Sequence, residues 1–536
     1  MKNLNFQPRF SLDGLAARFN TFSGAKVLSL MFLSGFLVRL VPELLAGAVP
    51  IGFDTVNYAV FIKSSVVWAH WSSFFTSTWL LNSLTVPIHS ISMVDPFLLL
   101  KIVAPALYGL NVAGVYWFTR KRLGWGLSMG VFAGFFFALQ LASLRISWDL
   151  LRNTLGMGFL LFAFTYVNEV ESKRGFILFS VLSLLTVFAH EYTGVTLLVV
   201  VLGLVAWRFV KRQFSSNSKR LLLGVLPALV VFVVILSSRF FPIGVAADTN
   251  VIRLDEPLSV EVGGLFFLEN YLAANSSVIS YGSYFDLAFN VLVLFALLFL
   301  PYLFLVVKGF FRNGVLDLWT CWLLIGAFGC LLFPFAALRL WYRWMFMLVY
   351  PFTFYATSGL KRLTGWFEDK SLRFSSFLSN KKATVMVLLT FTLGGVYLVT
   401  PCLMMCAGTS LPMPLSTSLY FSTSPAVPYE DVGSVTAAMS WLNQNMDGDS
   451  GVILQDVFLG FGRLYLDESK PIVHLHDDME LALQTTVDRG FAKVYFVYWN
   501  QPIGWVGISV PDYFDSVQDF GRISVYAYES VSLGSS

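Results

Sequence analysis

The sequence predicts an α-helical polytopic membrane protein that carries a small extracytoplasmic α/β domain at its C-terminal end. Of its 536 residues, 56% are apolar and only 13% are charged, and the mean hydropathy is +0.70. Apolar runs long enough to cross a bilayer, roughly 20 residues each, recur between residues 27 and 406. Residues 430–529 have no such run and hold 15 acidic and 5 basic residues, so we expect them to face water.

The apolar runs predict the membrane-spanning helices in chain order. We expect about 11–13 spans in the transmembrane domain 27–406. The eleven clearest candidates are 27–46, 97–118, 124–143, 151–168, 175–190, 193–210, 221–238, 284–307, 315–333, 342–360 and 384–406. The stretch 64–92 is rich in Ser, Thr and Trp, and we interpret it as helices that lie in the outer membrane interface.

Basic residues indicate the orientation of the chain in the cell membrane. By count, 22 of the 36 Lys and Arg residues fall in every second break between spans, together with the N-terminal segment 1–26. The positive-inside rule makes that side cytoplasmic. A cleaved signal peptide ending near Ala46 is the alternative to a retained first span. The outer loops 47–96 and 239–283 and the tail are then extracytoplasmic.

The tail alternates helix-like and strand-like segments, which is typical of an α/β domain. After a Ser-, Thr- and Pro-rich linker at 407–429, we expect the domain to occupy 430–536. The expected helices are 432–445 and 477–489, and the expected strands are 451–455, 471–474, 493–498 and 522–528. Its cluster of His474, His476, Asp477 and Asp478 is open to two interpretations, a metal site or ordinary alternation at the end of a strand. No motif supports a divalent metal, and we expect no cofactor.

Asp54 directly follows the first span in the sequence Pro50-Ile51-Gly52-Phe53-Asp54-Thr55-Val56-Asn57-Tyr58. A carboxylate held in a Pro- and Gly-shaped turn at the membrane surface is suited to accept a proton from an incoming hydroxyl. An equally open interpretation is that Asp54 caps the following helix.

Two further groups of charged residues lie at the outer ends of spans. Arg145, Asp149 and Arg152 are spaced i, i+4 and i+7, which predicts one helix face, either as a self-neutralising ladder or as a phosphate contact. Arg339 and Arg343 repeat the i, i+4 spacing among aromatic residues. Guanidinium groups bind phosphate bidentately, although Arg near Trp is also common at helix ends.

His190 and Glu191 lie between two apolar runs, in a turn or a kink. The pair lacks the His-x-x-x-His spacing of metal sites, so we expect either a satisfied structural pair or hydrogen bonds to a substrate. The basic residues are dispersed among the loops, which argues against nucleic-acid binding.

The first span with Arg39 and Pro42, followed by the segment from Pro50 to Tyr58, resembles the start of the GT-C superfamily of membrane glycosyltransferases. The blocks 147–153 and 343–351 resemble later segments of its archaeal and bacterial members. The resemblance implies transfer of a sugar from a polyprenyl- or dolichyl-phosphate donor to an acceptor hydroxyl, with Asp54 as the base or as the residue that positions the acceptor. It further implies that Arg343 and Arg152 bind the donor phosphate, with Tyr58 among the substrate contacts.

Two other classes of function stay open from the sequence. A transporter or flippase of lipid-linked sugars would also use arginines for phosphate, although the paired, broken spans typical of transporters are not evident. A non-catalytic membrane subunit would use the tail domain to contact partners. The acceptor, whether protein, glycan or lipid, is not specified by any motif.

Overall fold

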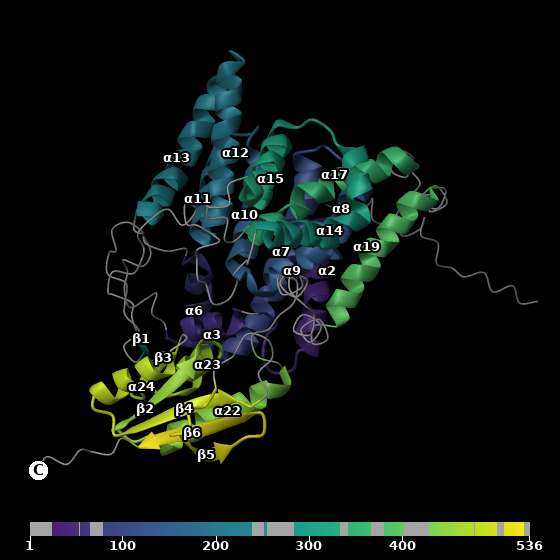
Figure 1. The fold of residues 1–536 in the computed structure, drawn as a ribbon. Coiled ribbons are helices and arrows are strands. Elements are labelled where there is room, and N and C mark those ends of the chain that lie inside the picture. Colours follow the sequence, from purple (N-terminus) through teal and green to yellow (C-terminus); the bar gives the residue numbers. More distant parts are fainter. Residues whose placement is uncertain are drawn as a thin grey trace, which may run out of the picture.

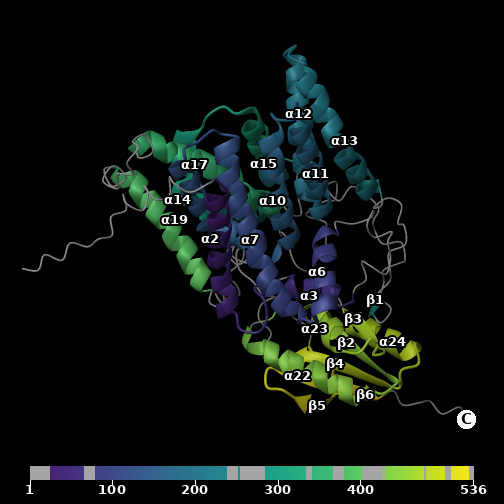
Figure 2. The same cartoon turned by 180° about the vertical axis from the view of Figure 1, so that it is seen from behind.

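The computed structural model consists of a helical bundle and a sheet domain that lies at one end of it (Figure 1), and the view from behind shows the same two parts (Figure 2). This confirms the predicted fold class. The structure describes residues 24–52, 54–64, 79–237, 251–253, 284–332, 341–365, 380–400, 427, 429–475, 478–500 and 509–529.

Each predicted span coincides with a helix or a pair of helices. The bundle helices are α2 (Gly24–Leu45), α7 (Pro96–Lys121), α8 (Leu127–Ala138), α9 (Leu141–Asp149), α10 (Leu151–Tyr166), α11 (Lys173–Ala189), α12 (Glu191–Val210), α13 (Ser216–Ser237), α14 (Tyr284–Gly309), α15 (Gly314–Leu332), α16 (Trp341–Met347), α17 (Val349–Thr364) and α19 (Lys381–Val399). The shorter α3 (Thr55–Ser64) and α6 (Leu80–Ser92) lie at the end next to the sheet domain. Residues 65–78 of the expected interfacial stretch lie outside the described residues.

Fewer helices than expected are long enough to span a bilayer alone. Among the described residues, seven helices meet the length and hydropathy of a span, or eight if α8 and α9, which bend by 59° at their break, form one. The expected spans 151–168 and 175–190 are helices of 16 and 17 residues. The expected span 342–360 is divided between α16 and α17.

Polar residues lie at two of the breaks between helices, one at His190 and one at Gln140. His190 is extended (φ −165°, ψ 142°) and separates α11 from α12. Gln140, at the bend between α8 and α9, is buried and donates from Nε2 to the Thr353 hydroxyl at 2.8 Å. A buried amide needs a partner, and this bond gives the bend one on another helix.

Small residues let the helices of the bundle approach closely. A Cβ atom at Gly35 in α2 would come to 2.6 Å from Val112 Cγ2, and one at Gly109 in α7 would come to 2.5 Å from the Phe32 carbonyl oxygen. Gly309 and Gly359 bring α14 and α17 into backbone contact in the same way. In a membrane, where burial of apolar surface gives little drive for helix association, such close van der Waals packing is a main source of stability.

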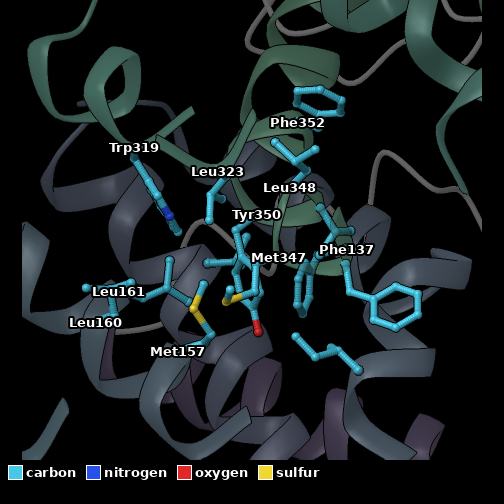
Figure 3. Packing of buried hydrophobic residues seen from close by; sticks show 14 of the residues in the cluster. Phe137, Met157, Leu160, Leu161, Trp319, Leu323, Met347, Leu348, Tyr350 and Phe352 are labelled. Atoms are coloured by element: carbon cyan, nitrogen blue, oxygen red, sulfur yellow. The ribbon is translucent and has the colours of Figure 1, made fainter. Parts of the chain in front are cut away.

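The centre of the bundle contains closely packed aromatic and aliphatic side chains, among them Phe137, Trp319 and Tyr350 (Figure 3). A few buried hydrogen bonds accompany this packing. The ring of Tyr350 in α17 packs against Phe137 and Trp319, with centroids 4.9 and 6.1 Å away. Its hydroxyl donates to Asn111 Oδ1 at 2.8 Å. Asn111 Nδ2 in turn donates to the Thr154 carbonyl at 2.7 Å. These bonds join α17, α7 and α10 at one buried point.

The sheet of the tail domain has six strands in the order β1-β3-β2-β4-β6-β5. Strands β1 (Val251–Arg253), β3 (Ile472–Leu475), β2 (Ser450–Gln455) and β4 (Lys493–Trp499) are parallel to their neighbours, whereas β6 (Ile523–Glu529) and β5 (Asp515–Asp519) are antiparallel. The helices are α22 (Tyr429–Asn445), α23 (Asp456–Tyr465) and α24 (Met479–Asp488). The four expected strands and two expected helices are therefore present.

Alternating side chains divide the domain into three layers. Val452 and Leu454 of β2 point toward the cluster that contains α22 and α23, whereas Ile453 points toward the cluster with α24. This is the period of two expected for a strand that is buried on both faces. The layer containing α23 lies against the helical bundle (Figure 1).

Three elements of the domain were not expected from the sequence. Residues Asp456–Tyr465 form helix α23, and β5 is a largely exposed strand. The third is β1, which precedes the tail by about 200 residues and pairs with β3 through the register Val251 to Ile472. A segment from between two helices of the bundle thereby joins the sheet of the tail domain.

Candidate functional site

Helix α3, which follows Asp54, lies between the bundle and the tail domain. Its residues Tyr58 and Ile62 pack in one apolar cluster with Leu100 of α7 and Leu464 of α23. The Lys63 ammonium donates to the Leu464 carbonyl. Because both parts of the molecule contact α3, its position and that of Asp54 at its start depend on how they fit together.

Asp54 occupies the position before the first turn of α3. Its carbonyl accepts the backbone N–H of Tyr58 at 3.1 Å, and its side chain is half-buried. The preceding turn is closed by the Thr55 hydroxyl, which donates to the Gly52 carbonyl at 2.8 Å. Gly52 has φ +127°, a conformation that glycine adopts without strain. The backbone at Asp54 thus agrees with the capping interpretation.

Tyr58 lies one turn further along α3 and faces the charged residues of the bundle. It is buried, and its hydroxyl hydrogen-bonds with the Arg152 side chain. Burial raises the pKa of Tyr58, while the charges of Arg152 and Arg343 oppose this and Asp54 adds to it. The phenol is therefore neutral at physiological pH, and it has two guanidinium groups and one carboxylate in its surroundings.

Arg343, in α16, is also near Tyr58 and Asp54. It interacts electrostatically with Asp54 and Tyr192, and it hydrogen-bonds with Tyr342, whose ring centroid lies 6.0 Å from its Cζ. One turn along α16, the ring of Phe346 lies 5.4 Å from Cζ of the buried Arg145 in α9. Two distant parts of the sequence, α10 with Arg152 and α16 with Arg343, thus bring basic groups to the start of α3.

The prediction that Arg145, Asp149 and Arg152 share one helix face is wrong. The chain leaves the helical conformation at Leu150 (φ −87°, ψ 52°), so Arg145 ends up in α9 and Arg152 at the start of α10. The i, i+4, i+7 rule requires a continuous helix. As a result, Arg145 packs on α16 while Arg152 contacts Tyr58. The side chain of Asp149 and all of Arg339 lie outside the described residues.

His190 and Glu191 form the junction between α11 and α12. His190 is buried, and its Nδ1 accepts the backbone N–H of Tyr192 at 3.1 Å, which caps α12 in the manner of an N-cap side chain. Its carbonyl accepts the Thr193 hydroxyl at 2.8 Å. Glu191 is in the first turn of α12, where a negative charge complements the helix dipole. These contacts favour the structural interpretation of the pair.

Two tyrosines near the basic groups were not singled out from the sequence. Tyr192 packs its ring 4.8 Å from Trp344 and interacts with Arg343, and Tyr342 hydrogen-bonds with Arg343. The only sequence signal for these tyrosines is their position, since Tyr342 directly precedes Arg343 and Tyr192 directly follows Glu191. In the part of the chain that the structure describes, no group of three His, Cys, Asp or Glu side chains is placed to hold a metal ion.

The chain was compared with known proteins. No protein-family model matches it, and no curated protein matches it. Among solved structures, ArnT from Cupriavidus metallidurans is 14% identical with a TM-score of 0.48, over 94% of this chain and 98% of that chain. The oligosaccharyltransferase of Archaeoglobus fulgidus is 12% identical with a TM-score of 0.45, over 87% of this chain and 69% of that chain. Both similarities extend over most of the present chain.

Proposed function

We propose that this protein is a membrane glycosyltransferase that transfers a sugar from a polyprenyl- or dolichyl-phosphate donor to an acceptor hydroxyl. The observation that carries the proposal is the grouping of Asp54, Tyr58, Arg152 and Arg343 at the start of α3. A carboxylate that can take a proton, set beside two cations that can bind a phosphate, meets the two needs of this reaction.

The proposed reaction is a single displacement. The acceptor oxygen attacks the anomeric carbon and gives its proton to Asp54, while the bond between that carbon and the phosphate oxygen breaks. The polyprenyl phosphate leaves with the bonding electrons, and the configuration of the sugar is inverted. No cofactor takes part in this scheme.

The two arginines stabilise the charge that develops on the leaving group. The donor is a phosphodiester with one negative charge, and the product is a phosphate monoester that gains a second. Preformed cations that face the site where this charge appears lower the barrier more than they tighten donor binding. Guanidinium also keeps its charge in an apolar setting, which suits Arg152 and Arg343 to this role. Tyr58 orients Arg152 through its hydroxyl.

We further propose that the end of the bundle with the tail domain is extracytoplasmic and that the N-terminus is cytoplasmic. The distribution of Lys and Arg among the loops supports this orientation. The acceptor would then reach Asp54 from the side of the tail domain, and the lipid-linked donor would enter from the outer leaflet.

The test is donor turnover in proteoliposomes. The protein is incubated with a panel of radiolabelled polyprenyl-phosphate hexoses, and release of polyprenyl phosphate is followed for wild type, Asp54→Asn and Asp467→Asn. The last variant makes the same change at an exposed carboxylate of the tail domain. We expect release by wild type and Asp467→Asn and none by Asp54→Asn. Movement of the intact donor across the bilayer would instead identify a transporter.

A further inference from the structure

The outer end of α2 carries a buried ion pair that the proposed reaction does not use. Arg39 Nη1 lies 2.7 Å from Glu43 Oε1, and the two side chains are 0% and 1% exposed. Ionisable groups at this depth are costly to bury. A buried pair is also no more stabilising, as a rule, than apolar residues of the same size. The role of the pair is therefore inferred from the groups that hydrogen-bond with Arg39 and Glu43.

The second oxygen of Glu43 holds the turn that leads to Asp54. Oε2 accepts the backbone N–H of Ile51 at 3.1 Å. Ile51 is fully buried and lies three residues before Asp54. On its other side, the same turn is closed by the bond from the Thr55 hydroxyl to the Gly52 carbonyl. The Glu43 carboxylate thus fixes the backbone entering the turn, and the Thr55 hydroxyl fixes the backbone leaving it.

Arg39, the partner of Glu43, connects this end of α2 to α9 through hydrogen bonds. Arg39 donates from Nε to the Ser147 hydroxyl at 3.0 Å and from Nη2 to the Ser147 carbonyl at 3.2 Å. Ser147 lies two residues after Arg145, the residue that packs on Phe346 of α16. One network therefore connects the turn before Asp54 with the helix that supports the Arg343-bearing segment.

Lys101 of α7 secures the end of α2 from another side. Its ammonium donates to the carbonyl oxygens of Glu43 and Gly47. The carbonyl groups in the last turn of a helix have no hydrogen-bond donor inside the helix. The Lys101 ammonium is the donor for two carbonyl groups here. The backbone of Glu43 is thereby held in place independently of its side chain.

We propose that Glu43 is a positioning residue for Asp54: its carboxylate, held by Arg39, accepts the Ile51 N–H and so sets the turn that presents Asp54 to the arginines. This inference rests on the proposed function. Glu43 acts through the backbone, since its two oxygens face Arg39 and Ile51, and it is not assigned a contact with substrate.

The test compares two double variants that differ only in the ability to accept a hydrogen bond. Changing one member of the pair would leave the other charge buried alone, which is strongly destabilising, so Arg39→Met is present in both. Arg39→Met with Glu43→Gln keeps an acceptor for Ile51, whereas Arg39→Met with Glu43→Leu has none. Met and Leu fill similar volume without charge.

Two measurements are made on each variant in the full-length protein. Hydrogen exchange of peptides covering residues 48–54 reports whether the turn is held, and steady-state turnover of the polyprenyl-phosphate hexose used by wild type reports kcat and KM. For the Leu variant we expect faster exchange and a kcat lower by about 100-fold, the scale of a roughly 1 Å misplacement. Its donor KM should change by less than about threefold. The Gln variant should keep both slow exchange and most of kcat.

The outcomes separate this inference from the proposed function. Equal exchange in the two double variants, or faster exchange with an unchanged kcat, would overturn the positioning role. If wild type is inactive on every donor, the proposed function fails, and the exchange comparison alone then decides whether Glu43 holds the turn.

Discussion

The hydroxyl of Tyr58 hydrogen-bonds with the guanidinium of Arg152, although the two residues lie almost a hundred positions apart in the chain. The bond joins α3 to the start of α10 in the bundle. It also places a neutral phenol beside a cation that we propose to bind the donor phosphate. Through this contact, α3 and α10 together define one side of the candidate site.

Replacement of Tyr58 by Phe should lower transfer while leaving the fold intact. The ring stays in its apolar cluster, and only the hydroxyl is lost. A hydrogen bond to a charged group contributes about 1.5–3 kcal/mol, so we expect a fall of about tenfold to a hundredfold in kcat/KM. The measurement is donor turnover in proteoliposomes. Tyr465→Phe removes a hydroxyl from α23 outside the site and should have little effect; an equal loss in both variants would contradict a specific role for Tyr58.

Arg343 should matter through its shape as well as its charge. Arg343→Gln removes the cation, and we expect kcat to fall by about 100- to 1,000-fold, as when one preformed charge-stabilising group is lost. Arg343→Lys keeps the charge without the two-pronged donor geometry and should lie between Gln and wild type. Arg220→Gln, at a guanidinium that donates to the Glu171 carbonyl in another loop, is the control. The role would be refuted by a Gln variant with wild-type kcat.

The contact between the tail domain and α3 should affect both the order of α3 and activity. A Cβ atom at Gly460 in α23 would lie 2.9 Å from Val56 Cγ1 in α3. We therefore expect Gly460→Ala to displace α23, to speed hydrogen exchange in residues 55–64 and to reduce donor turnover.

Gly433 provides a matched control for that change. It is also a helical glycine of the tail domain, in α22, and nothing lies within 4 Å of a Cβ placed there. Gly433→Ala should stabilise its helix by about 0.5–1 kcal/mol and leave α3 unaffected. If Gly460→Ala behaves in the same way, the tail domain does not hold α3 in place.

Asn111 should be important for stability rather than chemistry. Its side chain links Tyr350 of α17 with the Thr154 carbonyl of α10. Asn111→Leu leaves these groups without their partner, and hydrogen bonds between membrane helices contribute about 0.6–1.7 kcal/mol each. We expect a lower melting temperature in detergent. Ile102→Ala, at a half-exposed position of the same helix, should cause a smaller change, and the opposite order would contradict this assignment.

The stability of the tail domain should depend on pH through two carboxylates with opposite signs. Asp431 is buried, where it accepts the Trp499 indole N–H at 3.0 Å, and burial raises its pKa. A raised folded-state pKa means that its contribution is greatest below the ordinary value, about 3.9, and is lost as the pH rises through the folded-state pKa. For Asp447, a hydrogen bond from Ser450 lowers the pKa. Its contribution is therefore present above the ordinary value and is lost as the pH falls.

Because the two pKa shifts have opposite signs, the pH dependence of hydrogen exchange distinguishes the two carboxylates. Hydrogen exchange of α22 and β2 peptides in the full-length protein, corrected for the intrinsic pH effect, is followed from about pH 2.5 to 7, which includes the range below the ordinary carboxyl pKa of about 3.9. Asp431→Asn should remove the loss of protection that appears with rising pH, whereas Asp447→Asn should remove a loss that appears with falling pH. The same slope in both variants would show that these carboxylates do not control the domain's pH response.

Much of the fold was predictable because its signals are local. A run of about 20 apolar residues specifies a membrane helix wherever it occurs, and each expected span coincides with a helix. The strands of the tail also follow from short apolar runs, as at residues 493–498. Among the described residues, fewer helices than expected are long enough to span a bilayer alone, because hydropathy reveals neither the bend at Gln140 nor the division of the expected span 342–360 into two helices.

The sequence by itself determined the membrane class of the protein, the α/β tail and the candidate positions of Asp54 and the arginines, because these depend on residue type and nearby spacing. Only the tertiary structure decided which of these residues meet. The break at Leu150 separated Arg145 from Arg152, and the fold of the bundle then brought Arg152 and Arg343 to Tyr58. Strand β1 joined the tail sheet through backbone hydrogen bonds, which a three-residue side-chain pattern does not encode. Such contacts depend on distant segments, and no local pattern in the sequence records them.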